Sequence, residues 1–148
     1  MDPKLKHTVK DTLARGVTAL HKELYRRSGG RVGGKIGKTR MLVLTTTGRK
    51  SGQPRTTMLN YGTDGDRVIL IASYGGDDRA PQWYQNLMAN PEVSVQIGAE
   101  TRRLRAGNAT PEEKPRLWSI MTSAYPGYDG YQRKTEREIP VVVLSPLS

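Results

Sequence analysis

Three cations and several hydroxyl groups gather in one short segment, and they suit the binding of an anion. The segment runs Thr45-Thr46-Thr47-Gly48-Arg49-Lys50-Ser51-Gly52-Gln53-Pro54-Arg55. Arginine can fork onto two phosphate oxygens, lysine adds a point charge, and backbone amides of a glycine-containing turn can face the same anion. The segment is neither a Walker loop nor a GxGxxG motif. Its residues leave two interpretations open, an anion site and a solvated basic hairpin.

A second turn combines glycine with nearby aromatic residues, which suits a flat ligand. Ala72-Ser73-Tyr74-Gly75-Gly76 precedes Trp83 and Tyr84. Glycine lets a ligand approach the backbone closely, and an aromatic side chain can cover a ring. Core packing remains the alternative role for Trp83.

A third cluster holds Tyr125, Tyr128 and Tyr131 at three-residue spacing. The Gly and Pro content of this segment argues against a stable helix. We therefore expect the tyrosines in a flexible lid or a pocket wall, with core packing as the alternative.

Few side chains remain for other catalytic chemistry. Cysteine is absent, which excludes thiolate nucleophiles, disulfides, zinc ribbons and iron–sulfur clusters. Both histidines, His7 and His21, lie in the N-terminal segment, far along the chain from the three turns. The acidic pairs Asp77-Asp78 and Glu112-Glu113 have no obvious third ligand, so no metal site is expected. A reaction at these turns would take its chemistry from a bound cofactor.

The charge balance predicts an anionic partner. The 148 residues are enough for one domain, and 24 Lys and Arg stand against 14 Asp and Glu, for a net charge of +10. Nucleic acid, an anionic membrane surface and a phosphorylated or polyacidic small molecule all fit this charge. No apolar run is long enough to span a bilayer and no secretory signal is evident, so we expect residence in the cytoplasm.

The N-terminus predicts an amphipathic helix followed by a linker. Apolar residues recur every three or four positions over about residues 4–27. The glycines of residues 28–37 disfavour regular structure, so the expected units are 1–37, a helix with a Gly-rich linker, and 38–148, the domain. The helix either packs on the domain or lies peripherally on the inner face of the cell membrane.

The rest of the chain predicts a mainly β (α+β) fold, a small antiparallel barrel. Apolar and β-branched runs indicate about six strands, at 41–46, 55–61, 67–73, 93–97, 101–109 and 141–144. Asp64-Gly65 is expected in a type I′ hairpin turn. Two short inserted helices are expected, at 81–88 and from Thr110 to Ser123, with Pro115 bending or delaying the second.

Several of these motifs together resemble the deazaflavin-dependent nitroreductase family, which is mostly actinobacterial and has a split antiparallel β-barrel. The resemblance runs from about residue 41 to the C-terminus. It passes through LTTTGRKSGQPR, the IAS-x-GG turn, the P-x-WYxNL helix, ANPEVSVQI and the YPxYxxY cluster before IPVVVL. The shared order of several motifs makes the resemblance specific.

The resemblance implies coenzyme F420, a deazaflavin whose phosphate and oligoglutamate tail would account for the basic turn. It assigns the phosphate and tail to Arg49, Lys50, Ser51, Arg55, Thr56 and Thr57. It places the deazaflavin ring against Ile71, Ala72, Ser73, Tyr74, Gln82, Trp83, Tyr84, Gln85 and Asn86. The catalytic residues that face the substrate would be Ser73, Tyr125, Tyr128 and Tyr131. Many relatives carry lysine where Tyr74 stands, which would weaken the grip on the tail or shift that charge to Arg79.

The function implied is that of an F420H2-dependent reductase. It would transfer a hydride from reduced deazaflavin to an electron-poor small molecule, which is a quinone, an activated enone or lactone, or a nitroaromatic. A proton would come from solvent or a tyrosine hydroxyl. The expected partners are this small molecule and no nucleic acid, and both monomer and homodimer remain open.

Three other functions remain open, and each would leave a distinct experimental sign. An FMN-binding split-barrel oxidoreductase would place the flavin phosphate in the same basic turn. A nucleic-acid-binding module would show a steep salt dependence of DNA binding. A lipid or fatty-acid-binding barrel would copurify with acyl chains and show no cofactor-dependent turnover.

Overall fold

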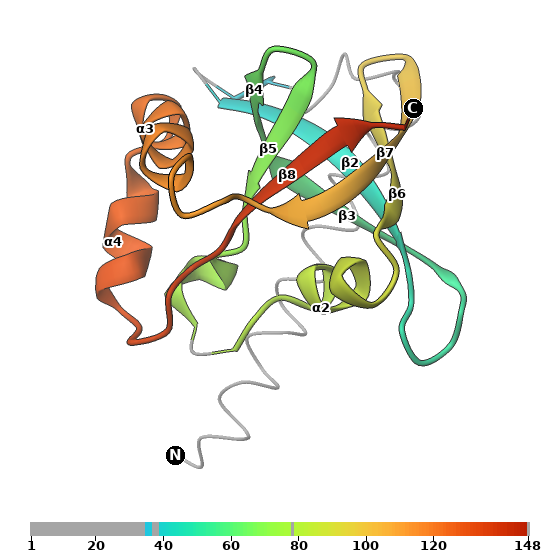
Figure 1. The fold of residues 1–148 in the computed structure, drawn as a ribbon, viewed down its shortest axis with the longest axis horizontal. Helices are drawn as coiled ribbons and strands as arrows, with labels where there is room; N and C mark the ends of the chain where they lie inside the picture. The colour runs from blue at the N-terminus through green and yellow to red at the C-terminus, as the bar shows by residue number, and fades with distance from the viewer. Residues whose placement is uncertain (1–34, 37–38, 78, 148) are drawn as a thin grey trace.

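The computed structural model describes residues 35–36, 39–77 and 79–147. The predicted helix over residues 4–27 lies outside this part of the chain and stays a prediction. Figure 1 shows the order of the elements. They are β1 (Lys35–Ile36), β2 (Thr39–Thr47), β3 (Pro54–Asn60), β4 (Gly62–Asp64), β5 (Arg67–Ile71), the 3-10 turn η1 (Tyr74–Gly76), α2 (Gln82–Ala89), β6 (Glu92–Ile97), β7 (Glu100–Asn108), α3 (Lys114–Ala124), α4 (Gly127–Arg133) and β8 (Val141–Pro146).

One antiparallel sheet wraps into an open barrel. Its strand order is β1-β2-β6-β7-β8-β5-β4, and β3 also pairs with β2. The outer strands β3 and β4 are joined in the chain by Tyr61 alone, whose amide donates to the carbonyl of Arg40 at 3.0 Å. The sheet therefore curls until β3 and β4 lie next to each other in the chain on either side of Tyr61. No strand pairing between β3 and β4 within the described residues closes the barrel. This is the expected split barrel.

Two apolar clusters bury both faces of β5 and β8. The cluster inside the barrel includes Leu42, Leu44, Val68, Leu70, Val93, Val95, Leu104, Val142 and Leu144. The second cluster fills the space beneath α3 and α4 with Ile69, Ile71, Leu117, Met121, Tyr128, Ile139, Val141 and Val143. Alternate residues of each strand enter different clusters. The unbroken aliphatic runs of these two strands therefore reflect burial on both faces.

The hairpin between β4 and β5 differs from the predicted type I′ turn. Asp64 pairs with Arg67, so Gly65 and Asp66 form the centre of the turn. Gly65 has φ +64°, whereas Asp66 has no positive φ. A type I′ turn needs positive φ at both central residues, and glycine at the first position is typical of type II′. The type I′ prediction was wrong because Asp64 belongs to the strand, where its carboxylate accepts hydrogen bonds from Arg116 and Arg67, which hold its pKa below the usual range.

The helix predicted from Thr110 begins later, at Lys114. The hydroxyl of Thr110 accepts from the amide of Glu113 at 3.2 Å, and the Glu113 carboxylate accepts from the amide of Thr110 at 2.9 Å. This reciprocal capping box satisfies amides ahead of the helix. Pro115 lies in the first helical turn, where proline is tolerated. The delay predicted from Pro115 is confirmed.

Two other expectations about irregular segments were wrong. The segment that carries the tyrosines forms the short helix α4, because packing of Tyr128 into the second cluster outweighs the weak helix propensity of its glycines. The sheet also begins at Lys35, inside the predicted linker, where β1 pairs with β2.

Candidate functional site

A cavity of about 490 Å³ opens between β3, the turn after β5, and α4. Its lining residues are Met41, Thr57, Met58, Leu59, Asn60, Ile71, Ser73, Tyr74, Gly75, Trp83, Tyr125, Tyr128 and Tyr131. None of these side chains carries a charge at neutral pH. Five aromatic side chains, four tyrosines and Trp83, lie among apolar and amide side chains and suit a flat, uncharged group.

The turn after β5 forms one wall of the cavity and has an unusual backbone. Tyr74, Gly75 and Gly76 have φ values of +47°, +65° and +82°. A β-carbon at Gly76 would lie 2.8 Å from the carbonyl oxygen of Tyr131, so glycine is required there for space as well as for conformation. Ser73, at the start of this turn, is buried. The turn therefore packs directly against the end of α4.

Tyr125, Tyr128 and Tyr131 form the adjoining wall. The rings of Tyr125 and Tyr128 meet edge to face with centroids 4.9 Å apart, and the hydroxyl oxygens of Tyr125 and Tyr131 are 3.3 Å apart. Burial raises the pKa of Tyr128 to about 12, although its hydrogen bond with Asn60 acts in the other direction. The hydrogen bond with Tyr125, and then burial, raise the pKa of Tyr131. The phenols of Tyr128 and Tyr131 are therefore neutral at physiological pH.

The basic turn between β2 and β3 is anchored on α2 through Asn86. The Asn86 carbonyl oxygen accepts from the backbone amide of Arg49 at 3.2 Å and from its Nη1 at 2.9 Å. The Asn86 amide group donates to the hydroxyl of Thr46 at 3.3 Å. Because Asn86 is only 5% exposed, these contacts fix the position of Arg49.

The tip of the basic turn points its other cations to solvent. Gly48 and Gln53 close the turn with an amide-to-carbonyl bond of 2.8 Å, and Gly52 has φ +71°. The hydroxyl of Ser51 accepts from the amide of Gln53 and from Nη2 of Arg55. Lys50 and Arg55 are exposed. The turn thus holds one anchored and two exposed cations in the arrangement expected of an anion site.

The structure brings some of the predicted site residues together and separates others. Those that share the cavity are Thr57, Ile71, Ser73, Tyr74, Trp83, Tyr125, Tyr128 and Tyr131. Arg49, Lys50, Ser51 and Arg55 lie in the basic turn, whereas Ala72 is buried in the barrel core. Thr56, Gln82, Tyr84, Gln85 and Asn86 do not line the cavity. Trp83 both lines the cavity and packs against the barrel core, so its two predicted roles are compatible.

Several cavity residues, and the contacts that hold them, were not predicted from the sequence. Met41, Met58, Leu59 and Asn60 line the cavity from β2 and β3. Their side chains had the pattern of ordinary strand residues, so no signal distinguished them. Tyr74 also has a cation beside it, because the Arg79 guanidinium lies 5.4 Å from its ring centroid and forms an ion pair with Asp77. A transfer of charge from position 74 to Arg79 stays a prediction.

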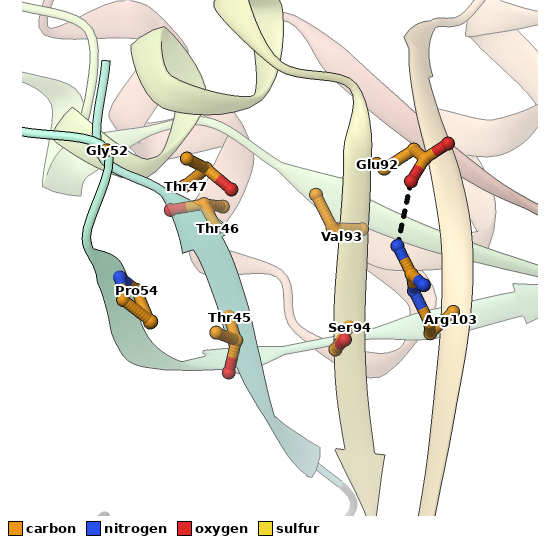
Figure 2. Close-up of a pocket in the computed structure, with 9 residues that line it drawn as sticks. All are labelled: Thr45, Thr46, Thr47, Gly52, Pro54, Glu92, Val93, Ser94 and Arg103. Carbon is orange, nitrogen blue, oxygen red and sulfur yellow. Dashed lines mark hydrogen bonds and ion pairs between the residues drawn. The ribbon is translucent and has the colours of Figure 1, made fainter. Parts of the chain in front are cut away.

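A second, smaller hollow of about 210 Å³ lies where β2 and β6 diverge beyond the pair Thr45 and Ser94. Figure 2 shows its hydroxyl side chains and the ion pair between Glu92 and Arg103, in which Nη2 and the carboxylate oxygen are 2.8 Å apart. No aromatic side chain lines this hollow. The larger cavity is therefore the better candidate for binding a ring.

The described residues contain no group of three or more acidic, histidine or cysteine side chains placed to hold a metal ion. In the same part of the chain, none of the helices has the length and apolar character needed to cross a membrane.

A sequence model of the F420H(2)-dependent quinone reductase family matches residues 17–146. The chain belongs to this family. An F420H(2)-dependent quinone reductase of Mycobacterium tuberculosis is 45% identical over 130 residues, which are 85% of this chain and 87% of that protein.

Two solved structures extend this likeness to the fold. One is described as an F420-H2 dependent reductase, FDR-A; it has a TM-score of 0.66, 40% identity, and coverage of 71% of this chain and 93% of that one. Another, described as a domain-swapped dimer, has a TM-score of 0.69, 32% identity, and coverage of 95% and 98%.

Family membership confirms the main conclusions of the resemblance. The chain is an oxidoreductase of the F420H2-dependent type, with coenzyme F420 as its cofactor and the split barrel as its fold. The mycobacterial relative agrees with the expected actinobacterial distribution. The family match also begins earlier than the resemblance, at residue 17.

The residues present fit coenzyme F420. The cavity is neutral and aromatic, as a deazaflavin ring requires, and the exposed cations Lys50 and Arg55 are available for a phosphate and an anionic tail. The helix α2 reaches both regions, because Trp83 lines the cavity and Asn86, three residues later, binds Arg49. Residues three apart in a helix share a face. A cofactor with a ring at one end and anionic groups at the other matches this arrangement.

Proposed function

We propose that the 490 Å³ cavity binds a quinone together with the deazaflavin ring of F420, while the basic turn binds the phosphate and tail. The observation that carries this proposal is the connection through α2 between Trp83 in the cavity and Asn86 under the basic turn. When bound, reduced F420 supplies the hydride that reduces the acceptor. The side chains of the protein bind the cofactor, orient the two rings and supply a proton to the acceptor.

The cations of the basic turn would hold the anionic end of the cofactor. Lys50 and Arg55 are exposed and can turn toward phosphate or carboxylate oxygens. Ser51 and Thr56 would add hydroxyl groups. Thr57, two residues beyond Arg55 on the same face of β3, lines the cavity. Arg49, already held by Asn86, contributes fixed positive charge near the anion.

The turn after β5 and the tyrosine wall would orient the two rings and exclude water. Trp83 supplies a flat apolar surface, and the glycines next to Tyr74 allow close approach to the backbone. Holding two reactants in a fixed geometry is the main contribution that a protein makes when the cofactor carries the chemistry.

The tyrosine hydroxyls would handle the proton. Tyr125 and Tyr131 share a hydrogen bond at the cavity, and their hydroxyl groups can donate to an oxygen of the reduced acceptor. Tyr128 also keeps its proton at any physiological pH because burial raises its pKa to about 12. Tyr128 therefore acts as a neutral hydrogen-bond partner.

A quinone suits the cavity better than a charged acceptor does. The lining contains no charged side chain to compensate a carboxylate or phosphate on the substrate, and an unpaired charge is costly to remove from water. Quinones are flat, uncharged and carry two oxygens that can accept hydrogen bonds. The description of the family and the activity of the M. tuberculosis relative support the same acceptor class.

The test measures binding first and turnover second. The protein is titrated with F420 and separately with FMN, with tryptophan fluorescence as the signal, and oxidation of F420H2 by menadione is then followed by absorbance. Binding of F420 in preference to FMN, with menadione-dependent oxidation, is the expected result. Preference for FMN would move the protein to the flavin-binding interpretation, and failure to bind either would return the lipid and nucleic-acid interpretations.

The proposed assembly is a homodimer in the cytoplasm. The solved structure described as a domain-swapped dimer, at 32% identity, supports a dimer for this chain. Light scattering after size-exclusion chromatography should give twice the chain mass of 16.4 kDa, and a single-chain mass would contradict it. Membrane contact through residues 4–27 stays a prediction, which vesicle binding by the full chain and by a variant without residues 1–34 would test.

A further inference from the structure

Arg137 donates hydrogen bonds to three backbone carbonyls of the turn after β5, which carries Ser73 and Tyr74. Its Nη2 donates to the carbonyl oxygens of Ser73 at 2.9 Å and Ala72 at 3.1 Å, and its Nε donates to that of Asp77 at 3.0 Å. These carbonyls bracket the residues with positive φ. A single half-buried guanidinium therefore closes the turn that carries Ser73 and Tyr74.

Gln132 connects the same arginine segment to the tyrosine helix. From the end of α4, its side-chain amide donates to the carbonyl of Arg137 at 2.8 Å, and its side-chain oxygen accepts from the amide of Ile139 at 2.9 Å. Gln132 is the residue after Tyr131, which lines the cavity. The two side chains form a continuous link from the tyrosine wall to the Ser73 turn.

The turn after β5 needs such a link because its backbone conformation is unfavourable. Tyr74 is the one described residue other than glycine with positive φ, a conformation in which an ordinary side chain is crowded against its own backbone. Two glycines follow it, and glycine loses the most freedom when it is fixed. The turn has two backbone hydrogen bonds of its own, at 3.0 and 3.1 Å, and the contacts from Arg137 add to them in keeping it in one conformation.

We propose that Arg137, supported by Gln132, is a positioning residue that fixes the distance between the Ser73 turn and the tyrosine wall. This inference rests on the proposed function, in which the two walls hold the rings of cofactor and acceptor. Arg137 does not line the cavity, so it acts only through the carbonyls that it binds. Its loss should disturb alignment of the rings more than binding of the cofactor tail.

Kinetics of three variants test the first part of this proposal. We expect Arg137→Gln, Arg137→Lys and Arg137→Ala to lower kcat with menadione by about 10- to 100-fold, because small displacements of reacting groups have effects of that size. The Kd for F420 should stay within about 3-fold, since the basic turn is untouched. The lysine variant keeps the charge, so its failure to restore kcat would show that the forked geometry matters.

A matched control removes a guanidinium elsewhere. Arg103→Gln breaks an exposed ion pair with Glu92 on the outer face of the sheet, where exposed pairs add little stability. Its kcat and its Kd for F420 should match those of the unmodified protein. A similar loss of kcat in this control would overturn the specific role of Arg137.

Two further measurements separate positioning from general stability. Guanidinium added at a few tens of millimolar, far below denaturing concentrations, should restore part of kcat in Arg137→Ala and leave the kcat of Arg103→Gln unchanged. Hydrogen exchange of the cofactor-free protein should accelerate at residues 72–77 in the Arg137 variants and in Gln132→Ala. Exchange in the strands of the barrel core should stay slow.

The outcomes distinguish this inference from the proposed function. If the unmodified protein does not oxidise F420H2 with menadione, the proposed function fails. Hydrogen exchange at residues 72–77 then still tests whether Arg137 holds the turn. If the unmodified protein is active but the Arg137 variants keep full kcat, or exchange at residues 72–77 is unchanged, the positioning role is wrong. If Arg137→Ala does not fold, the lysine and glutamine variants provide the same comparison.

Discussion

The neutral cavity and the basic turn recognise ligands by opposite physical means. The cavity is lined by aromatic, apolar and amide side chains, many of them half-buried, and its shape depends on packing and on a few hydrogen bonds. The basic turn is exposed at Lys50 and Arg55 and offers charge on a short hairpin. Shape recognition is sensitive to small displacements and insensitive to salt, whereas charge recognition behaves in the opposite way.

The helix α2 is the point where the two regions meet. Trp83 lines the cavity, and Asn86 forms hydrogen bonds with Arg49 and Thr46 at the base of the basic turn. A substitution of Asn86 should therefore affect cofactor binding without altering the side chains that line the cavity. The comparison becomes testable by variants on either side of this helix.

The largest expected effect is on the charged side. In the double variant Arg49→Gln and Arg55→Gln, the Kd for F420 should rise about 100-fold at low salt, because each charge-assisted contact contributes about a factor of 10. The Kd for the deazaflavin that lacks phosphate and tail should hardly change. Fluorescence titration with both ligands measures this, and equal losses for the two would show that the turn does not hold the tail.

A smaller effect is expected from Asn86→Ala, which removes the support of the turn. The Kd for F420 should rise about 10-fold as Arg49 loses its orientation, and the protein should lose about 1–3 kcal/mol of stability because the buried partners lose hydrogen bonds. Met88→Ala, on the exposed side of the same helix, is the control. Titration with F420 and urea unfolding measure both quantities; unchanged affinity would mean that Arg49 needs no anchor.

Local patterns in the sequence predicted the barrel because the strands carry strong signals. Val68 to Ile71 and Val141 to Leu144 are continuous aliphatic runs, and such runs indicate strands buried on both faces. Pro81 and Asn90-Pro91 bracket α2 closely. The charged turn was also predictable, since its cations are adjacent in the chain and need no tertiary contact to be recognised.

Features that depend on distant contacts were not predictable in this way. The segment of α4 has the glycine and proline content of a loop, and it becomes helical because Tyr128 packs into the second cluster beside Trp118 of α3. Arg137 reads as one more surface cation, although its guanidinium binds carbonyls 60 to 65 positions earlier in the chain. Asn86 likewise gave no sign that its partner would be Arg49.

On the neutral side, Tyr128→Phe should change turnover while leaving the cofactor in place. The Kd for F420 should stay within about 2-fold, and kcat with menadione should change by about 5-fold, the equivalent of one neutral hydrogen bond. Steady-state kinetics and titration measure the split. A loss of cofactor binding would place Tyr128 against the cofactor instead of the acceptor.

The same variant has a signature in the pH dependence of stability. Burial raises the pKa of Tyr128 to about 12, above the value of about 10 for an exposed tyrosine. Its contribution to stability is therefore complete below about pH 10 and is lost as the pH rises toward 12. Urea unfolding above pH 10 should show a shallower decline for Tyr128→Phe than for the unmodified protein, and parallel declines would contradict the burial of the phenol.

The smallest expected effect separates the two regions in the unmodified protein. Raising the ionic strength from about 0.05 M to about 0.5 M shortens the screening length to a few ångströms, so exposed Lys50 and Arg55 should attract the tail less strongly. The Kd for F420 should rise about 3-fold, whereas the KM for menadione, which meets no charged side chain, should stay constant. Titrations and initial rates at both salt concentrations give these two numbers. An equal response of both would mean that charge reaches the cavity, and the division between a charged and a neutral region would have to be abandoned.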